Sequence, residues 1–504
     1  MNSLSQLITL FCITAVSPLL SADGEDLKPL GIFDHHQDVG DPMLAGSASY
    51  DSETQTYRIK GAGKNMWNVE DQFHFAWKKI RGDFIMRATI QFVGEGVQNH
   101  RKIGIMSRDS LEKDSRYADA CVHGDISTAL QYREQDGEIT GTLKFPVYHP
   151  TEIILERRGN TFSFSASVFG ETFKSVTHEQ ELNEETYVGL FVCSHQEDVI
   201  EEAIFSNVRI VIPAPEGQVK YKEYLGSHLE VMDVHTGHRK ILHSENRSLQ
   251  APNWTPDNRY LIYNAEGLLY KYDLEDGGIR ELNTGSVKAN NNDHVLSFDG
   301  KQLGISSRVM EPRASTIYTV PIEGSDNPRQ ITDPANGQSY LHGWSPDGTH
   351  LLFTGLRDEQ WDIWSVNVSS GKETNLTQHE SKDDGSEFTP DGEWIYFNSV
   401  RTGTMQIWRM KPDGSGQEQI TFDSFNNWFP HISPDGKWIV YIAFPEDMDP
   451  TSHPFYKRVN LKLMPTSGGF PKTIAHLYGG QGTINVPSWS PDSRYIAFVS
   501  NTGM

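Results

Sequence analysis

A short turn segment recurs six times in the second half of the chain and constrains its fold more than any other feature. Each copy has an aromatic or aliphatic residue, then Ser or Thr, Pro or Phe, Asp, and in four copies Gly. The copies are Trp254–Asn258, Leu296–Gly300, Trp344–Gly348, Phe388–Gly392, Ile432–Gly436 and Trp489–Ser493. Their aspartates are separated by 42, 48, 44, 44 and 57 residues, a spacing typical of one β-propeller blade per copy.

The residues around each copy predict four strands per blade. An apolar strand such as Tyr260–Tyr263 follows the turn, then a third strand such as Ile363–Val366, a glycine-containing turn and a fourth strand. In the turn, Pro fixes φ, Asp can accept hydrogen bonds from the backbone, and Gly tolerates a positive φ. The last copy has only one further strand after it, and the missing pair is found before the first copy, at Leu229–Val234 and Arg239–Leu242. We therefore expect a six-bladed propeller over residues 225–504, closed by strands from both of its ends.

Residues 28–212 follow a different pattern, in which apolar and polar residues alternate and helical signals are nearly absent. The alternation is clearest at Phe84–Phe92 and at Phe162–Val168. Many short strands without helices predict a β-sandwich, so the whole chain is expected to be all-β. Two prolines and a glycine in Val211–Gln218 indicate a linker, which we place at residues 213–224.

The first 22 residues are typical of a secretory signal peptide. Leu7–Leu20 is a short apolar run, and the small residues Ser21 and Ala22 follow it. The alternative is a buried N-terminal segment. A signal peptide predicts a secreted or periplasmic bacterial protein with no membrane span after cleavage.

The charge balance argues against two classes of partner. The chain has 44 basic and 67 acidic residues, a net charge of −23, whereas nucleic acids and anionic membrane surfaces attract basic proteins. Cys121 and Cys193 remain after the predicted cleavage. They could pair with each other or stay as two core thiols.

The repeats resemble TolB-type propellers, which are extracytoplasmic proteins of bacterial envelopes. The resemblance rests on the turn segments, on Arg357 and Arg401 ten residues after their aspartates, and on Ile-Trp in the third strand. It covers about 280 residues. Propellers of this type occur in binding proteins, peptidase gating domains and oligogalacturonide lyases, so the resemblance implies the fold and leaves the activity open.

The N-terminal half resembles a bacterial concanavalin-like, or jelly-roll-like, sandwich family. The resemblance is carried by Phe73–Trp77, Gly82–Phe84, Gly104–Arg108 and Leu130–Arg133. It implies an accessory domain that binds glycans, whereas the TolB protein itself has a mixed α/β domain at this place. The candidates for glycan contacts are His100, Arg101, Lys102, His123 and His195.

Topology predicts where the propeller could bind a ligand. In a four-stranded meander, the loop that enters the first strand and the loop between strands two and three lie at one end, opposite the recurrent turns. We call this end the mouth. Its candidate ligand-binding residues are Arg308, Arg357, Arg401, Trp428, Gln481 and Asn485.

Two interpretations of the mouth arginines stay open. A guanidinium group can bind a carboxylate or sulfate with two hydrogen bonds, so Arg308, Arg357 and Arg401 could orient an anionic ligand. Alternatively they brace neighbouring loops, which the recurrence of two of them at one repeat position favours.

The mouth histidines also have two interpretations. His294, His342 and His431, with a carboxylate such as Asp384, could hold a divalent metal ion, the one cofactor that the sequence suggests. Alternatively these histidines pack between blades.

A loop of 15 residues, Phe444–Arg458, interrupts an otherwise regular blade. Long loops in compact domains are usually functional or mobile, and His453 or Lys457 could act there as a general base. The alternative is a plain insertion with solvated charges. The full set of candidate catalytic residues is His431, His453, Lys457, Asp384 and Glu387.

Two functions fit these features. The first is a secreted or periplasmic TolB-like protein that binds an extracellular polymer, a polysaccharide or oligosaccharide, or an envelope protein, at the mouth. The alternative is a carbohydrate-active enzyme, a lyase or glycoside hydrolase, that uses the same mouth.

Overall fold

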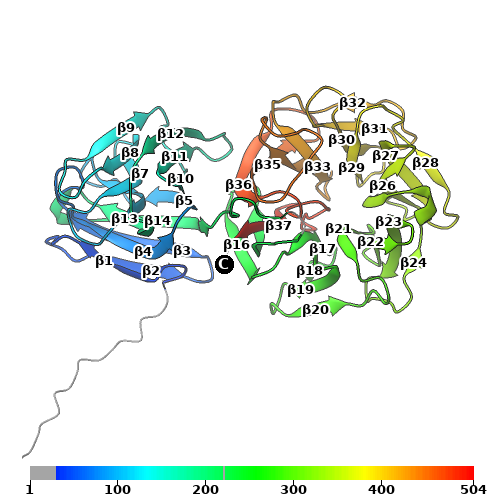
Figure 1. Ribbon diagram of the computed structural model, residues 1–504, viewed down its shortest axis with the longest axis horizontal. Coiled ribbons are helices and arrows are strands. Elements are labelled where there is room, and N and C mark those ends of the chain that lie inside the picture. Colours follow the sequence, from blue (N-terminus) through cyan, green and yellow to red (C-terminus); the bar gives the residue numbers. More distant parts are fainter. Residues whose placement is uncertain (1–29, 220–221, 504) are drawn as a thin grey trace, which may run out of the picture.

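The computed structural model describes residues 30–219 and 222–503, and in these residues the protein is all-β. A sandwich and a propeller lie side by side, joined by the segment that follows β14 (Figure 1). The predicted signal peptide, residues 1–22, lies outside the described residues. In the described part of the chain, no helix has the length and apolar character needed to cross a membrane.

The sandwich consists of two seven-stranded antiparallel sheets. The first contains, in order, β1 (His35–Val39), β4 (Phe73–Arg81), β13 (Glu185–Cys193), β6 (Lys102–Arg108), β7 (Tyr117–His123), β8 (Thr128–Arg133) and β9 (Gly141–Phe145). The second contains β12 (Lys174–Glu179), β11 (Thr161–Ser167), β10 (Glu152–Arg158), β5 (Phe84–Phe92), β14 (Gln196–Val211), β3 (Thr56–Gly63) and β2 (Ser47–Asp51). The predicted two-layer arrangement is thus present, and its relation to concanavalin-like proteins stays a prediction.

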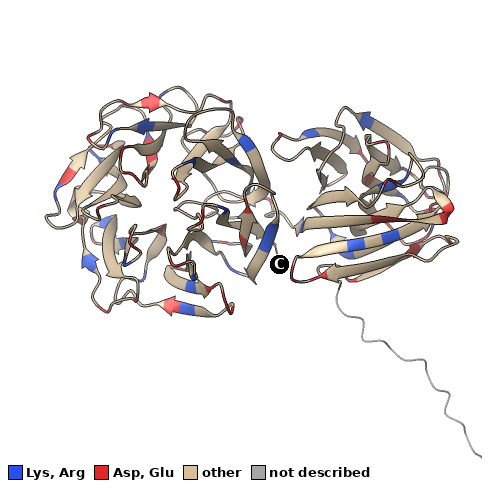
Figure 2. Ribbon diagram, turned by 180° about the vertical axis from the view of Figure 1, so that it is seen from behind, with Lys and Arg blue, Asp and Glu red and all other residues tan. Residues whose placement is uncertain are grey.

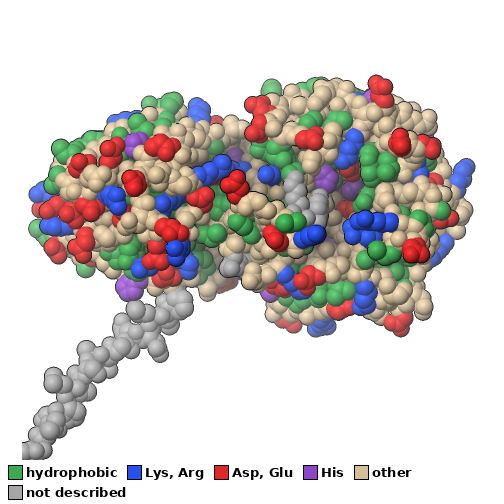
Figure 3. Space-filling view, viewed as in Figure 1, with side chains coloured by type: hydrophobic (Ala, Val, Ile, Leu, Met, Phe, Trp, Pro, Cys, Tyr) green, Lys and Arg blue, Asp and Glu red, His purple; other side chains and the backbone are tan. Residues whose placement is uncertain are grey.

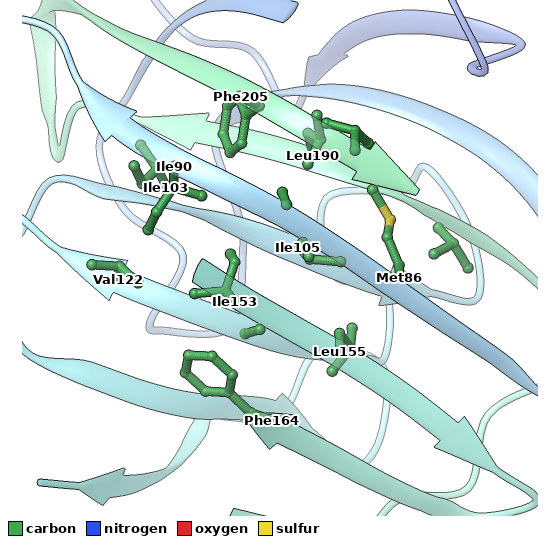
Figure 4. Packing of buried hydrophobic residues seen from close by; sticks show 14 of the residues in the cluster. Met86, Ile90, Ile103, Ile105, Val122, Ile153, Leu155, Phe164, Leu190 and Phe205 are labelled. Atoms are coloured by element: carbon green, nitrogen blue, oxygen red, sulfur yellow. The ribbon is translucent and has the colours of Figure 1, made fainter. Parts of the chain in front are cut away.

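The sandwich core forms where the alternating residues of the two sheets face each other (Figure 4). Met86 of β5 and Leu155 of β10 meet Ile105 of β6 and Leu190 of β13 in one buried cluster. Burying apolar area of this kind stabilises a fold by about 25 cal/mol per Å². Cys121 and Cys193 are both buried and unpaired, so of the two possibilities for these residues the structure has the free thiols.

The propeller has the six predicted blades. Five are four-stranded sheets: β17 (Gln250–Trp254), β18 (Tyr260–Ala265), β19 (Leu268–Asp273) and β20 (Ile279–Leu282); β21 (Asn290–Leu296), β22 (Gln302–Met310), β23 (Arg313–Pro321) and β24 (Arg329–Gln330); β25 (Ser339–Trp344), β26 (His350–Arg357), β27 (Gln360–Asn367) and β28 (Glu373–Asn375); β29 (Asp383–Phe388), β30 (Ile395–Ser399), β31 (Gln406–Met410) and β32 (Glu418–Gln419); β33 (Asn426–Ile432), β34 (Trp438–Phe444), β35 (Lys457–Pro465) and β36 (Lys472–Gly479). The described residues contain one helix, the short η1 (Pro334–Asn336), between the second and third of these blades.

The sixth blade joins the two ends of the propeller. Its sheet has the order β16 (Arg239–Glu245), β15 (Gly226–Asp233) and β37 (Tyr495–Thr502), with β15 antiparallel to β37 along eight residue pairs from Gly226↔Thr502 to Asp233↔Tyr495. On its inner side, β37 meets the last turn segment through the bridge Trp489↔Ile496. The predicted closure by strands from both ends is confirmed.

The six turn segments share one hydrogen-bond network, which explains their recurrence. In Ser345–Gly348, for example, the Ser345 hydroxyl donates to Asp347 Oδ1 (2.6 Å) and accepts from the backbone N–H of His350 (2.9 Å). The same two bonds occur in the other five copies. Gly348 has φ 70°, a left-handed conformation that favours glycine over residues with a Cβ atom. Asn258 and Ser493 adopt the same conformation where two copies lack the glycine.

A buried ionic network holds the sandwich against the propeller. Glu230 of β15 accepts hydrogen bonds from Arg209 of β14 (2.8 Å) and from Arg239 of β16 (2.6 Å), and all three side chains are buried. Ser500 of β37 donates to the same carboxylate (2.5 Å). Burial opposes ionisation of Glu230, but Arg209 and Arg239 outweigh it and hold its pKa well below the ordinary range. Outside this network, charged residues are distributed over the strands and loops of both domains (Figure 2).

Replacing Glu230 by Gln should destabilise the protein strongly, because it leaves two guanidinium groups buried without their counter-charge. We expect the free energy of unfolding to fall by about 3–5 kcal/mol, measured by urea denaturation at neutral pH. Glu323→Gln, at a side chain that is 88% exposed, is the matched control and should change stability by no more than about 0.5 kcal/mol. Equal stability of the two variants would contradict the network's role.

Candidate functional site

The candidate site lies in the propeller mouth, where the inner strands of the blades begin. Strand β21 starts at Asn290 beside Ser307 near the end of β22, so the entering loops and the second-to-third-strand loops share one end, as the topology predicts. Figure 3 shows histidine side chains at the centre of the propeller on the face turned to the viewer. We define the mouth cluster as the polar side chains that meet there: Asn292, Asp293, His342, Lys382, Asp384, His453 and Gln481.

Asp384 of β29 is the most connected member of the mouth cluster. Its Oδ1 lies 3.2 Å from His342 Nε2 and accepts a hydrogen bond from the Thr354 hydroxyl at 2.8 Å, while its Oδ2 lies 3.5 Å from Lys382 Nζ. Burial disfavours the charged carboxylate, but His342 and Lys382 outweigh this effect and hold the pKa of Asp384 well below its usual range. Asp384 is therefore an ionised hydrogen-bond acceptor in the mouth cluster.

Asp293 of β21 differs from Asp384 in that its pKa is raised. Its carboxyl group is almost fully buried, and burial raises its pKa to about 6, an effect that His342 opposes and Asp384 reinforces. Burial also disfavours the charged form of His342, but Asp384 and Asp293 outweigh it and raise the pKa of His342. Two carboxyl groups of different acidity thus act electrostatically on one imidazole, and one of them, Asp384, contacts it directly.

The other side of the mouth cluster is built from amides and an imidazole. Gln481 accepts a hydrogen bond at its Oε1 from His453 Nδ1, and its amide donates to Asn292 Oδ1 (3.2 Å). Asn485 also donates to Gln481 Oε1 (3.3 Å). Burial lowers the pKa of His453 to about 4, so this imidazole is neutral at physiological pH. The amide of Asn292 is buried, and its Nδ2 has no hydrogen-bond partner among the described residues.

The predicted long loop folds over the mouth. His453 packs its ring 4.4 Å from Trp428 and 5.1 Å from Phe429. Lys382 Nζ donates to the Thr451 carbonyl (3.1 Å), and the Asn426 side chain donates to the carbonyls of Pro445 and Met448 (both 3.2 Å). Trp428 is fully buried beneath this loop, so a ligand reaches it only after the loop moves.

Bulges in the inner strands direct these side chains. Strands β25, β29 and β33 each contain one extra residue relative to the neighbouring strand shortly before their turn segment, and β21 contains two. Gly385 (φ 59°) and Phe429 (φ 55°) adopt left-handed conformations inside two of these bulges. A bulge re-aims side chains relative to a regular strand, and here it places His342, Asp293 and their neighbours at the channel.

Two of the three histidines proposed as metal ligands pack between blades. His294 Nε2 lies 3.1 Å from the Ile262 carbonyl. His431 lies between the Glu387 carboxylate (2.7 Å) and the Ile484 carbonyl (2.8 Å), so both of its nitrogens are engaged. Within residues 30–219 and 222–503, no group of three or more His, Cys, Asp or Glu side chains is arranged to hold a metal ion. His294, His342 and His431 with Asp384 therefore do not fit a divalent metal in this arrangement.

Two of the three predicted ligand-binding arginines brace loops. Arg357 donates to the Gln338 carbonyl (2.6 Å) and pairs with Glu373 (3.0 Å). Arg401 pairs with Asp383 (2.7 Å) and donates to the Gln417 side chain (2.5 Å). The side chain of Arg308 is exposed.

The remaining predicted catalytic residues are divided between the loop and the blades. His453 belongs to the mouth cluster, whereas Lys457 is exposed at the start of β35, paired with Gly479 of β36. Glu387 is buried and accepts a hydrogen bond from the Ile432 N–H (3.0 Å) besides contacting His431, so it bonds to the neighbouring blade.

Three histidines of the sandwich that are candidates for glycan contacts lie close together, although they are far apart in the sequence. The His100 ring lies 5.4 Å from that of His195 and 6.5 Å from that of His123. Burial, reinforced by Lys102, lowers the pKa of His123 and His195 to about 4. Arg101 instead forms a buried pair with Glu201 (2.7 Å).

Lys382 and Thr354 are parts of the site that the sequence patterns did not identify. Lys382 lies six residues before its turn segment, where the other copies have Ser248, Asn290, Gln338, Asn426 and Thr483. An alignment of the six copies at this position would have shown a polar residue in each and one positive charge. Thr354 lies within an apolar strand and gives no such signal.

Comparison with known proteins identifies the family. A family model described as the TolB beta propeller domain matches residues 309–452. The uncharacterized protein Atu1656 of Agrobacterium fabrum is 44% identical over 274 residues, which are 54% of this chain and 92% of that protein. This chain belongs to the TolB-like β-propeller family.

One solved structure agrees with this assignment. A structure from Agrobacterium tumefaciens, described as a TolB candidate, is 42% identical with a TM-score of 0.53, covering 56% of this chain and all of that chain. TolB from Acinetobacter baumannii is also similar, at 15% identity and a TM-score of 0.41, covering 65% of this chain and 79% of that one. The two Agrobacterium proteins each account for about half of this chain.

Asp293→Asn should stabilise the protein, and more so at high pH. The folded-state pKa of Asp293 is raised to about 6 from 3.8, so its ionisation costs stability in full above pH 6 and progressively less as the pH falls toward 4. We expect a gain of about 1–3 kcal/mol at pH 8 and a smaller gain at pH 5, measured by chemical denaturation. A loss of stability at pH 8, or a gain that grows toward pH 5, would contradict the assigned pKa.

Lys382→Met should loosen the long loop without unfolding the blade, because it removes the bond to the Thr451 carbonyl. Backbone amides of residues 445–456 should exchange hydrogen about tenfold faster, which corresponds to ~1.4 kcal/mol. Lys372→Met, at an exposed lysine in the opposite end's loop, is the matched control and should leave this exchange unchanged. Identical exchange in both variants would show that Lys382 does not hold the loop.

Proposed function

We propose that this chain is a secreted or periplasmic TolB-like protein that binds an extracellular polymer, a carbohydrate chain or a segment of an envelope protein, at the propeller mouth. The convergence of polar side chains at the channel is the observation that carries the proposal. Asn292 and Asp293 come from one blade, His342 from the next, Asp384 from a third, and His453 and Gln481 from the segments that follow. The opposite end repeats one turn, with the same two hydrogen bonds, six times.

The chemistry of the mouth suits a partner rich in hydroxyl or amide groups. Asp384 supplies a charged acceptor, while Asn292 and Gln481 supply amide donors and acceptors. Trp428 and Phe429 provide aromatic surface that a sugar ring or an apolar side chain could contact once His453 withdraws. The family membership and the predicted signal peptide support a location outside the cytoplasm. The sandwich would then act as an accessory domain, with His100, His123 and His195 as its candidate glycan contacts.

A second candidate function rests on one specific feature, the electrostatic influence of Asp293 and His342 on each other within the mouth cluster. A buried carboxyl group with a pKa near 6 in the same cluster as an imidazole is a candidate general acid or base. This feature favours a carbohydrate-active enzyme, a lyase or hydrolase, as the alternative use of the same mouth.

A screen of the purified full-length protein separates these functions. Uronate-containing and neutral oligosaccharides and envelope polysaccharides would be tested for binding by calorimetry and for unsaturated products by ultraviolet absorbance. We expect binding without turnover, weakened at least tenfold, about 1.4 kcal/mol, in Asp384→Asn. Lys372→Met should bind as the unchanged protein does. Product formation that is lost in Asp293→Asn would instead establish the enzyme, and saccharide binding that Asp384→Asn leaves intact would place the site elsewhere.

A further inference from the structure

A pocket lies at the junction between the sandwich and the propeller, away from the mouth. It has a volume of about 220 Å³. Strands β5, β10 and β14 of the sandwich and strands β15, β16, β35 and β36 of the propeller contribute to its walls. In Figure 1 these strands face each other where the two domains meet. Pockets between domains are frequent sites for small ligands.

Positive charge is in excess around this junction pocket. Arg87, Arg209, Arg239 and Arg458 line it, and the carboxylates paired with them are Glu152, Glu156 and Glu230. Four guanidinium groups therefore face three carboxylates, which leaves one positive charge without a counterpart in the pocket. A buried uncompensated charge is costly, and a bound anion would compensate it.

Individual polar atoms in the pocket also lack partners. Arg87 is 6% exposed, bonds to Glu152 (3.2 Å) and to the His476 carbonyl, and yet has no partner for its Nε among the described residues. The Nε2 atom of His476 is buried and likewise unpartnered within those residues. The Tyr478 hydroxyl accepts a hydrogen bond from the Ala214 N–H (3.0 Å), which leaves its own proton free to donate. The Arg87 Nε–H and the Tyr478 hydroxyl are thus the two candidate donors to an acceptor in the pocket.

The remaining walls are largely apolar. Ile85, Ile154, Ile210, Val211 and Leu477 line the pocket, and Phe173 packs edge-on against His476 at 4.0 Å. An inorganic anion would leave these walls without contacts, whereas an organic acid could place its body against them.

The electrostatics of Arg87 also favour a negatively charged ligand. Burial, reinforced by Arg239 and Arg209, lowers the pKa of Arg87 to about 10 despite its contact with Glu152.

We propose that the junction pocket binds a small organic carboxylate, with the carboxylate facing Arg87 and Tyr478 and the apolar body against the isoleucine wall. The ligand would contact both domains at once, because Arg87 belongs to the sandwich and Tyr478 to the propeller. The proposal does not depend on the function proposed for the mouth.

Calorimetry on the full-length protein with pairs of an acid and a similar neutral compound tests the charge requirement. The probes are benzoate with benzamide, D-glucuronate with D-glucose, and inorganic phosphate. We expect one or both acids to bind at least tenfold more tightly than the neutral partner and than phosphate. The two acids distinguish an aromatic body from a sugar body. If neither acid binds at millimolar concentration, if acid and neutral probe bind equally, or if phosphate binds as well as the acids, the proposal fails.

Variants place the binding in the junction pocket. Tyr478→Phe should weaken acid binding about tenfold. Ser175→Trp, at an exposed position of β12 that lines the pocket, should block entry while preserving the fold, which is checked by thermal denaturation. Asp384→Asn, in the mouth, should leave acid binding unchanged. Acid binding that survives Ser175→Trp or is lost in Asp384→Asn would overturn the assignment.

Discussion

The pairing of β15 with β37 is the interaction on which the rest of the propeller depends. Eight residue pairs join the first strand of the propeller to its last, and without them the two parts of the sixth blade would each present an open edge. The closed ring holds the mouth loops at fixed positions, so side chains from different blades can meet in one cluster. The same sheet also carries Glu230, whose carboxylate binds both Arg209 of the sandwich and Ser500 of the closing strand. Ser500 lies 270 residues after Glu230 along the chain. Ring closure and domain docking therefore share one strand.

Much of this architecture could be predicted from the sequence because its signals are local. The Ser/Thr–Pro–Asp–Gly turn satisfies its own hydrogen bonds, so the same residues produce the same turn wherever they occur. Strand count, ring closure and the polarity of the blades then follow from the spacing of the turns. For Arg357 and Arg401 the sequence also favours loop bracing over ligand binding, because both residues occupy the same repeat position. In the structure each of them contacts acceptor oxygens of nearby residues.

The candidate site could be predicted only in part, because its geometry depends on bulges. His294 and His342 occupy the same place relative to their turns, yet they differ in role. His294 stays in register with Ile305 and reaches the carbonyl of Ile262, whereas His342 falls within the bulge of β25 and reaches Asp384. A bulge shifts side chains by a local backbone change that residue types alone do not specify. The sequence likewise does not show which residues on neighbouring blades contact each other, such as Thr354 and Asp384.

Closure by the last strand also has a consequence for biosynthesis. The chain emerges from its N-terminus, so the sandwich strands up to Val211 are complete while the propeller is still being made. Strand β15 is then present without its partner until Tyr495–Thr502 has been synthesised, and its open edge can pair with other chains in that interval. The nascent protein therefore carries this unpaired strand edge throughout the synthesis of the five blades that lie between its two closing strands.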